Sequence, residues 1–135
     1  MDYTSATTLE TGMRCHTEFY NATRTRVVTD VDAAMGGLGE QPSPGDLLAA
    51  TVASCMLSMV AYTGKRKGFE TVGICIQAAC GEGTQGVGSL HFDITVPMPT
   101  QPQQRRLMEA AVASCPVGNS LHPDIPKVLH WHWAQ

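Results

Sequence analysis

Residues 43–68 read SPGDLLAATVASCMLSMVAYTGKRKG, and this stretch decides the fold. Its beginning carries the start signals of a helix. Ser43 is a favourable N-cap, Pro44 suits the first helical position, and Asp46 stands where a capping box places its acidic residue. Its end carries three consecutive basic residues and then Gly68, which favour termination. The stretch therefore predicts one long helix.

The helix predicted over residues 43–67 is apolar on every side, since no charged residue lies between Leu47 and Thr63. A helix that is apolar all round is expected to be buried all round. At about 1.5 Å per residue it would be roughly 36 Å long, which is the width of a small domain. Its apolar run is interrupted by polar residues and is judged shorter than the ~20 residues that cross a bilayer. We therefore expect the central helix of a soluble protein.

The composition is that of a soluble globular domain, with 135 residues, 43% hydrophobic and 16% charged. The net charge is only −3 and the basic residues are scattered, so neither nucleic acid nor a membrane surface is expected as a partner. Residues 1–12 lack the basic start and apolar core of a signal peptide. We expect a cytoplasmic protein whose five cysteines form no disulfide framework.

The segments around the central helix predict an α+β domain spanning residues 1–135. Alternating and β-branched patterns predict a hairpin over residues 12–30, a second hairpin over 71–96 and a closing strand over 127–133. A second helix is predicted over residues 102–114. The expected fold has antiparallel sheets packed around the long helix. The clearest strand alternates between inward and outward residues, the inward ones being Leu90, Phe92, Ile94 and Val96.

A domain of this size exposes a large share of its surface. One chain would struggle to cover an apolar helix of this length on every side. A symmetric homodimer, in which two such helices pack on each other, is therefore predicted.

Cys55 lies in the middle of the predicted helix. A cysteine in an apolar helix is most often a small buried hydrophobe. The neighbouring helical residues are uncharged, so they do not activate the thiol. If Cys55 is a nucleophile, a cation must reach it from another segment, and the candidates are Arg14, Arg24 and Arg26.

Cys115 has a different setting, because Pro116 disfavours helical geometry in the residue before it. A short helical turn beginning at Pro116 would place Cys115 at its N-cap. Unpaired N–H groups at that position are expected to lower the pKa of the thiol. Cys55 and Cys115 could form a dithiol pair only if their Cα atoms lie within about 7 Å, which sequence spacing does not establish. The other cysteines are interpreted as packing residues, and these are Cys15, Cys75 and Cys80.

Two stretches resemble the signatures of the OsmC/Ohr family. Residues 44–56, PGDLLAATVASCM, resemble the family's helix entry, with a proline, a Leu-Leu pair, a run of small residues and a cysteine eleven positions after the proline. Residues 114–121, SCPVGNSL, resemble the second signature, cysteine-proline followed by a small residue and Asn. Both occur in the family's order, and the predicted elements match its layout from about residue 12 onward.

The resemblance implies an intertwined homodimer that reduces organic hydroperoxides in oxidative-stress defence, with hydrogen peroxide as a second candidate substrate. It implies that Cys55 is the peroxidatic nucleophile and that Cys115 resolves it through a disulfide. A strand arginine, for which Arg14 is chosen with Arg24 and Arg26 as alternatives, would hold the thiolate and the peroxide. An external dithiol would restore the enzyme, and no metal or organic cofactor is implied. The surroundings expected to accept an alkyl group are Leu48, Val52, Met56 and Met59.

One position departs from the family pattern. Many family peroxidases have a glutamate directly after the proline, and this chain has Gly45. Asp46 and Glu40 are the neighbouring carboxylates that could pair with the arginine instead, although neither matches residue for residue. The alternative function is a non-catalytic dimeric module that binds a small apolar ligand at the dimer interface. A weaker third option is a structural metal site of cysteine and histidine.

Overall fold

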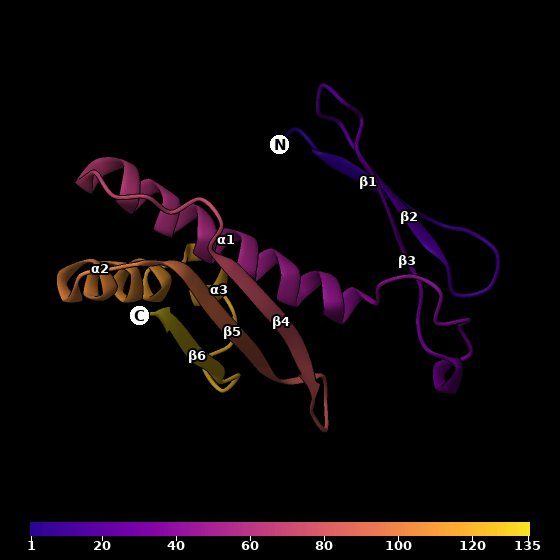
Figure 1. Cartoon of the computed structure of the whole chain (residues 1–135). Helices are drawn as coiled ribbons and strands as arrows, with labels where there is room; N and C mark the ends of the chain where they lie inside the picture. The colour runs from indigo at the N-terminus through magenta and orange to yellow at the C-terminus, as the bar shows by residue number, and fades with distance from the viewer. The chain divides into compact units, whose positions relative to one another are not determined.

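The computed structural model describes all residues 1–135 and divides the chain into two compact units, Met1–Leu47 and Leu48–Gln135. Each unit contains its own three-stranded sheet (Figure 1). The sequence predicts one domain over residues 1–135, and the structure distributes those residues between the two units. The α+β fold class is confirmed.

The N-terminal unit is built on an antiparallel sheet with the strand order β1-β2-β3. The strands are β1 (Ser5–Leu9), β2 (Cys15–Phe19) and β3 (Arg26–Thr29). The hairpin predicted over residues 12–30 corresponds to β2 and β3, whereas β1 was not predicted. A loop with one 3-10 turn, Ala33–Met35, follows β3 and leads toward the long helix.

The long helix α1 (Pro44–Lys67) begins as its sequence predicts. The Ser43 N–H donates to Asp46 Oδ2 at 3.0 Å, and the Asp46 N–H donates to Ser43 Oγ at 3.1 Å, which completes the capping box. The helix ends where Gly68 adopts a φ of +80°, a backbone conformation that glycine tolerates without steric cost.

Within one chain α1 buries a single face rather than its whole circumference. Ser54, Ser58 and Tyr62 are exposed. The expectation of a helix buried all round is therefore not met by one chain alone. The buried residues recur at helical spacing and are Ala49, Val52, Ala53, Met56, Val60 and Gly64.

The length and composition of α1 would allow it to cross a membrane, since its best 18-residue window has a mean hydropathy of 1.6. The expectation that the helix is too short for this was wrong. Core helices of soluble proteins have the same properties, and Val52, Met56 and Val60 of α1 lie in the hydrophobic core of the C-terminal unit.

The C-terminal unit has the strand order β4-β5-β6. Strands β4 (Cys75–Glu82) and β5 (Val87–Pro99) are antiparallel, but β5 and β6 (Lys127–Ala134) are parallel. This pairing differs from the expected antiparallel sheets. The helices α2 (Pro102–Ala113) and α3 (Pro116–Asn119) lie between β5 and β6 in the chain and form the crossover connection that parallel strands require (Figure 1).

Strand β5 lies at the centre of its sheet and supplies the core. Its predicted alternation is confirmed, because Leu90, Phe92, Ile94 and Val96 are each at most 1% exposed. They pack in one cluster with residues of α1 and α2 and with the Cys115 side chain. The core therefore holds Cys115 in place.

We expect Phe92→Ala to lower the free energy of unfolding by about 3–5 kcal/mol, because it leaves a cavity in this core. Urea denaturation at fixed protein concentration measures the change. Val72, which is 82% exposed, offers the control, and Val72→Ala should leave the unfolding midpoint nearly unchanged. Equal effects of the two substitutions would contradict this account of the core.

Candidate functional site

Cys115 occupies the N-cap of α3, as its position before Pro116 predicts. The Gly118 N–H donates to Cys115 Sγ at 3.3 Å, and the thiol donates to the backbone oxygen of Val52 on α1 at 3.9 Å. The residue is only 1% exposed. These contacts direct its sulfur toward the turn of α1 that precedes Cys55.

The thiols of Cys55 and Cys115 lie close enough to interact electrostatically, although 60 residues separate them in the sequence. Cys55 is half-buried, and both thiols are free rather than joined in a disulfide. The structure therefore supplies the proximity that sequence spacing could not establish.

The expected lowering of the Cys115 pKa is wrong. Burial raises the pKa of this thiol, and the neighbouring Cys55 raises it further. The Gly118 N–H lowers it but is outweighed. Cys115 is therefore held as the protonated thiol at neutral pH.

The four side chains expected to form an apolar pocket divide into two groups. Leu48 and Met59 are half-buried, like Cys55. Val52 and Met56 are 0% and 2% exposed and belong to the core. Val52 and Met56 therefore offer no exposed surface to a substrate, since they lie on the inner face of α1. Leu48 and Met59 remain available to a ligand beside Cys55.

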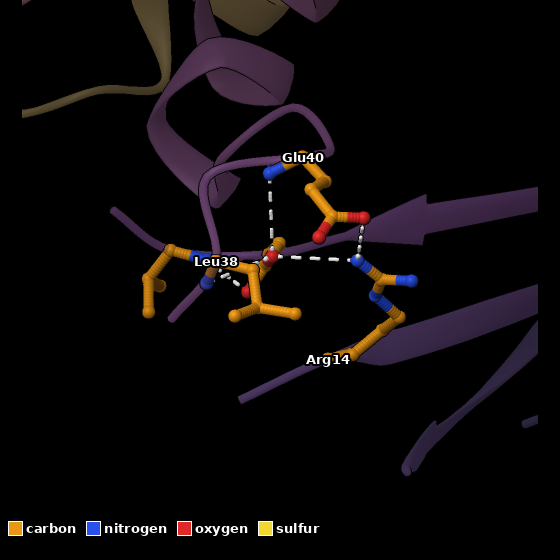
Figure 2. A network of polar contacts seen from close by, with 5 residues as sticks. Arg14, Leu38 and Glu40 are labelled. Carbon is orange, nitrogen blue, oxygen red and sulfur yellow. Dashed lines mark hydrogen bonds and ion pairs between the residues drawn. The ribbon is translucent and has the colours of Figure 1, made fainter. Parts of the chain in front are cut away.

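In the N-terminal unit, Arg14 lies directly before β2 and contacts two carboxylates (Figure 2). Its Nη2 atom lies 3.5 Å from Asp30 Oδ2 and 3.4 Å from Glu40 Oε2. Glu40 is one of the two acidic partners considered from the sequence. Asp30 is not among the carboxylates that the sequence singles out, and it is the more deeply buried of the two.

Asp30 is a buried carboxylate, only 2% exposed. Its side chain accepts backbone N–H groups from Val31 at 2.8 Å, Leu38 at 3.2 Å and Glu40 at 3.4 Å. Burial raises the pKa of Asp30, but these donors and Arg14 together reverse the shift, so the pKa lies below its ordinary value. The available signal was an aspartate directly after an apolar strand and before a glycine-containing loop, where carboxylates often accept loop N–H groups.

Asp46 has a structural role at this end of α1. Its carboxylate accepts the Ser43 N–H, and no hydrogen bond or ion pair joins it to Arg14. The proposal that Asp46 pairs with the arginine is therefore not supported by these contacts.

The two alternative arginines are exposed, Arg24 in the connection between β2 and β3 and Arg26 at the start of β3. Arg24 pairs with Glu18 at 3.2 Å, and Arg26 pairs with Glu10 at 2.8 Å. Both side chains are more than half exposed, whereas the Arg14 side chain is 29% exposed. Among the three candidates, only Arg14 contacts a buried carboxylate.

Arg14 and Asp30 line a cavity of about 360 Å³ within the N-terminal unit. Met13 and Leu38 contribute apolar surface to the same cavity. Its size is that of a small-molecule site, and its lining combines the Arg14 guanidinium and the carboxylates of Asp30 and Glu10 with apolar surface. Such a lining suits a small ligand with both a polar and an apolar part.

No group of three or more histidine, cysteine or acidic side chains in residues 1–135 is arranged to hold a metal ion. The cysteine–histidine metal site raised from the sequence therefore has no geometric basis.

A family model described as OsmC-like protein matches residues 37–129. No curated protein sequence matches the chain. Among solved structures, a Psychrobacter arcticus protein, provisionally described as an osmotic stress induced and detoxification response protein, has a TM-score of 0.92 at 25% identity. That match covers 98% of this chain and 97% of the other.

Two further structures are described as organic hydroperoxide resistance proteins. The one from Elizabethkingia anophelis has a TM-score of 0.74 at 22% identity and covers 99% of both chains. The one from Legionella pneumophila has a TM-score of 0.74 at 17% identity and covers 96% of this chain and 97% of the other. At these identities the two matches establish a shared fold.

Proposed function

Given that the chain belongs to the OsmC-like protein family, we propose that it is a thiol-dependent peroxidase that reduces organic hydroperoxides in oxidative-stress defence. The observation that carries the proposal is the adjacent pair of free thiols, Cys55 half-buried on α1 and Cys115 buried behind it. Relatives described as organic hydroperoxide resistance proteins support the substrate class.

In the first proposed step, the Cys55 thiolate attacks the terminal oxygen of a hydroperoxide. An S–O bond forms, the O–O bond breaks, and the departing alkoxide takes a proton from solvent to leave as the alcohol. Cys55 is oxidised to a sulfenic acid while the hydroperoxide is reduced. The half-buried Leu48 and Met59 provide apolar surface beside the sulfur for the alkyl part.

In the second step, Cys115 attacks the sulfur of the Cys55 sulfenic acid. Because burial raises the pKa of Cys115, this residue enters the step as a thiol, and its proton leaves with the displaced hydroxyl as water. An S–S bond replaces the S–O bond. An external dithiol then reduces the disulfide by exchange and is itself oxidised.

Arg14 is proposed to supply the positive charge that the apolar helix does not offer Cys55. A guanidinium beside a thiol favours the thiolate, and its N–H groups suit the oxygens of a peroxide. The proposed protein is a cytoplasmic homodimer, in which a second copy covers the exposed side of α1.

Peptide mapping under non-reducing conditions tests the function directly. One equivalent of cumene hydroperoxide should be consumed, and a peptide pair linked through Cys55 and Cys115 should appear. Cys75, which is exposed on β4, should remain a free thiol and serves as the internal control. If neither peroxide loss nor the linked pair is seen, the alternative of a module that binds a small apolar ligand is favoured.

A further inference from the structure

A single nitrogen of the Arg14 guanidinium is shared between two carboxylates of very different burial. Nη2 faces both Asp30 and Glu40, at 3.5 Å and 3.4 Å (Figure 2). The Asp30 side chain is 2% exposed and the Glu40 side chain is 60% exposed. The two partners therefore differ in how firmly they can hold the arginine.

Asp30 is fixed in position by its own loop. Its carboxylate accepts the N–H groups of Val31, Leu38 and Glu40, so both oxygens are engaged before Arg14 is counted. Gly37 allows this close packing, because a Cβ atom there would lie 2.0 Å from the Val31 carbonyl oxygen and 2.7 Å from Asp30 Oδ1. The carboxylate cannot shift without displacing the loop. Glu40 reaches Arg14 with a flexible and largely solvated side chain.

The rest of the guanidinium is left without a partner in the chain. A guanidinium carries five N–H donors, and Nη2 supplies two of them. No hydrogen bond or ion pair engages Nη1 or Nε of Arg14. Arg14 also lines the cavity of about 360 Å³. Three N–H donors are therefore available to an oxygen-bearing ligand.

We propose that Asp30 is the positioning residue of this site, holding Nη2 of Arg14 so that Nη1 and Nε are presented to the hydroperoxide. Glu40 is a secondary, exchangeable partner. This inference rests on the proposed peroxidase function. The chain has Gly45 at the helix entry, so no side chain at that position can contact the arginine. The proposal assigns this contact to Asp30, a buried aspartate directly after β3.

Asp30→Asn and Glu40→Gln form a matched pair of variants, since each replaces a carboxylate by an amide of the same shape. In Asp30→Asn the amide NH₂ is itself a donor and must face either the backbone N–H groups or the guanidinium. The contact that holds Nη2 of Arg14 is therefore lost. We expect kcat/KM for cumene hydroperoxide to fall about 10²-fold, the cost typical of a misplaced catalytic group. Glu40→Gln should lower it at most about fivefold, as for an exposed ion pair.

The orientation of Arg14 can be read without activity, from the ¹⁵N resonances of its guanidinium, assigned by their loss in Arg14→Lys. We expect slow rotation in the wild type and in Glu40→Gln, and averaged resonances in Asp30→Asn. Averaged resonances in Glu40→Gln, or unchanged ones in a folded Asp30→Asn, would overturn the proposal. If Asp30→Asn does not fold, the Glu40→Gln spectrum still decides whether Glu40 is needed to hold Arg14 in position.

Repeating Asp30→Asn in the Arg14→Lys background distinguishes a role of Asp30 through Arg14 from a purely structural role. If Asp30 acts through Arg14, the additional loss of kcat/KM should be much smaller there. An equal loss in both backgrounds would show that Asp30 only maintains the fold. A wild type without peroxidase activity would refute the proposed function, while the ¹⁵N measurement would still test the anchoring.

Discussion

Cys55→Ser is expected to reduce hydroperoxide consumption to the rate of the protein-free reaction. The chemistry requires a thiolate nucleophile, and a serine hydroxyl remains protonated at neutral pH and cannot form the sulfenic acid. Serine is small enough to occupy the half-buried position on α1 without a clash. The measurement is the rate of cumene hydroperoxide loss with a dithiol in excess.

Two controls make this result specific to Cys55. Cys75→Ser removes an exposed thiol on β4 and should leave the rate unchanged. The unfolding midpoint of Cys55→Ser should remain close to that of the wild type, because Ser54 and Ser58 already occupy the same helix. Equal steady rates for wild type and Cys55→Ser would exclude the proposed chemistry altogether.

The parts of the fold that the sequence predicts are those specified by near neighbours. The capping box of Ser43 and Asp46 starts α1, and the alternation from Leu90 to Val96 identifies the buried face of β5. Strand β1 was missed because its exposed, threonine-rich residues bear no apolar alternation. The parallel pairing of β5 with β6 depends on the route of the chain through α2 and α3, which local patterns do not record.

In the candidate site, too, the features set by near neighbours in the sequence are predicted and those set by distant residues are not. Pro116 correctly predicts the N-cap position of Cys115, which is a local property. The direction of the Cys115 pKa shift was predicted wrongly because the thiol is buried by residues distant in sequence. Asp30 was missed because its significance comes from loop N–H groups up to ten residues away. Val52 shares a helical face with Cys55 in sequence terms, but packing places it in the core.

Cys115→Ser should permit one turnover for each Cys55 and then stop. The first step needs only Cys55, so one equivalent of hydroperoxide is still reduced. Without the neighbouring thiol, the sulfenic acid cannot be converted to the intramolecular disulfide, and further hydroperoxide oxidises it to the sulfinic acid. Rapid-quench measurement should show a full first turnover in the variant, followed by loss of steady activity. Mass spectrometry should find one and then two added oxygen atoms on Cys55.

The substitution is well suited to this test because serine is itself a favourable N-cap. Its hydroxyl can accept the Gly118 N–H in place of the sulfur, so α3 should begin at the same residue. A loss of activity caused by unfolding would remove the first turnover as well, which separates it from a loss of resolution. Sustained turnover in Cys115→Ser, with no oxygen accumulating on Cys55, would mean that an external thiol resolves the sulfenic acid. The proximity of the two thiols would then be a feature of packing, with no part in the reaction.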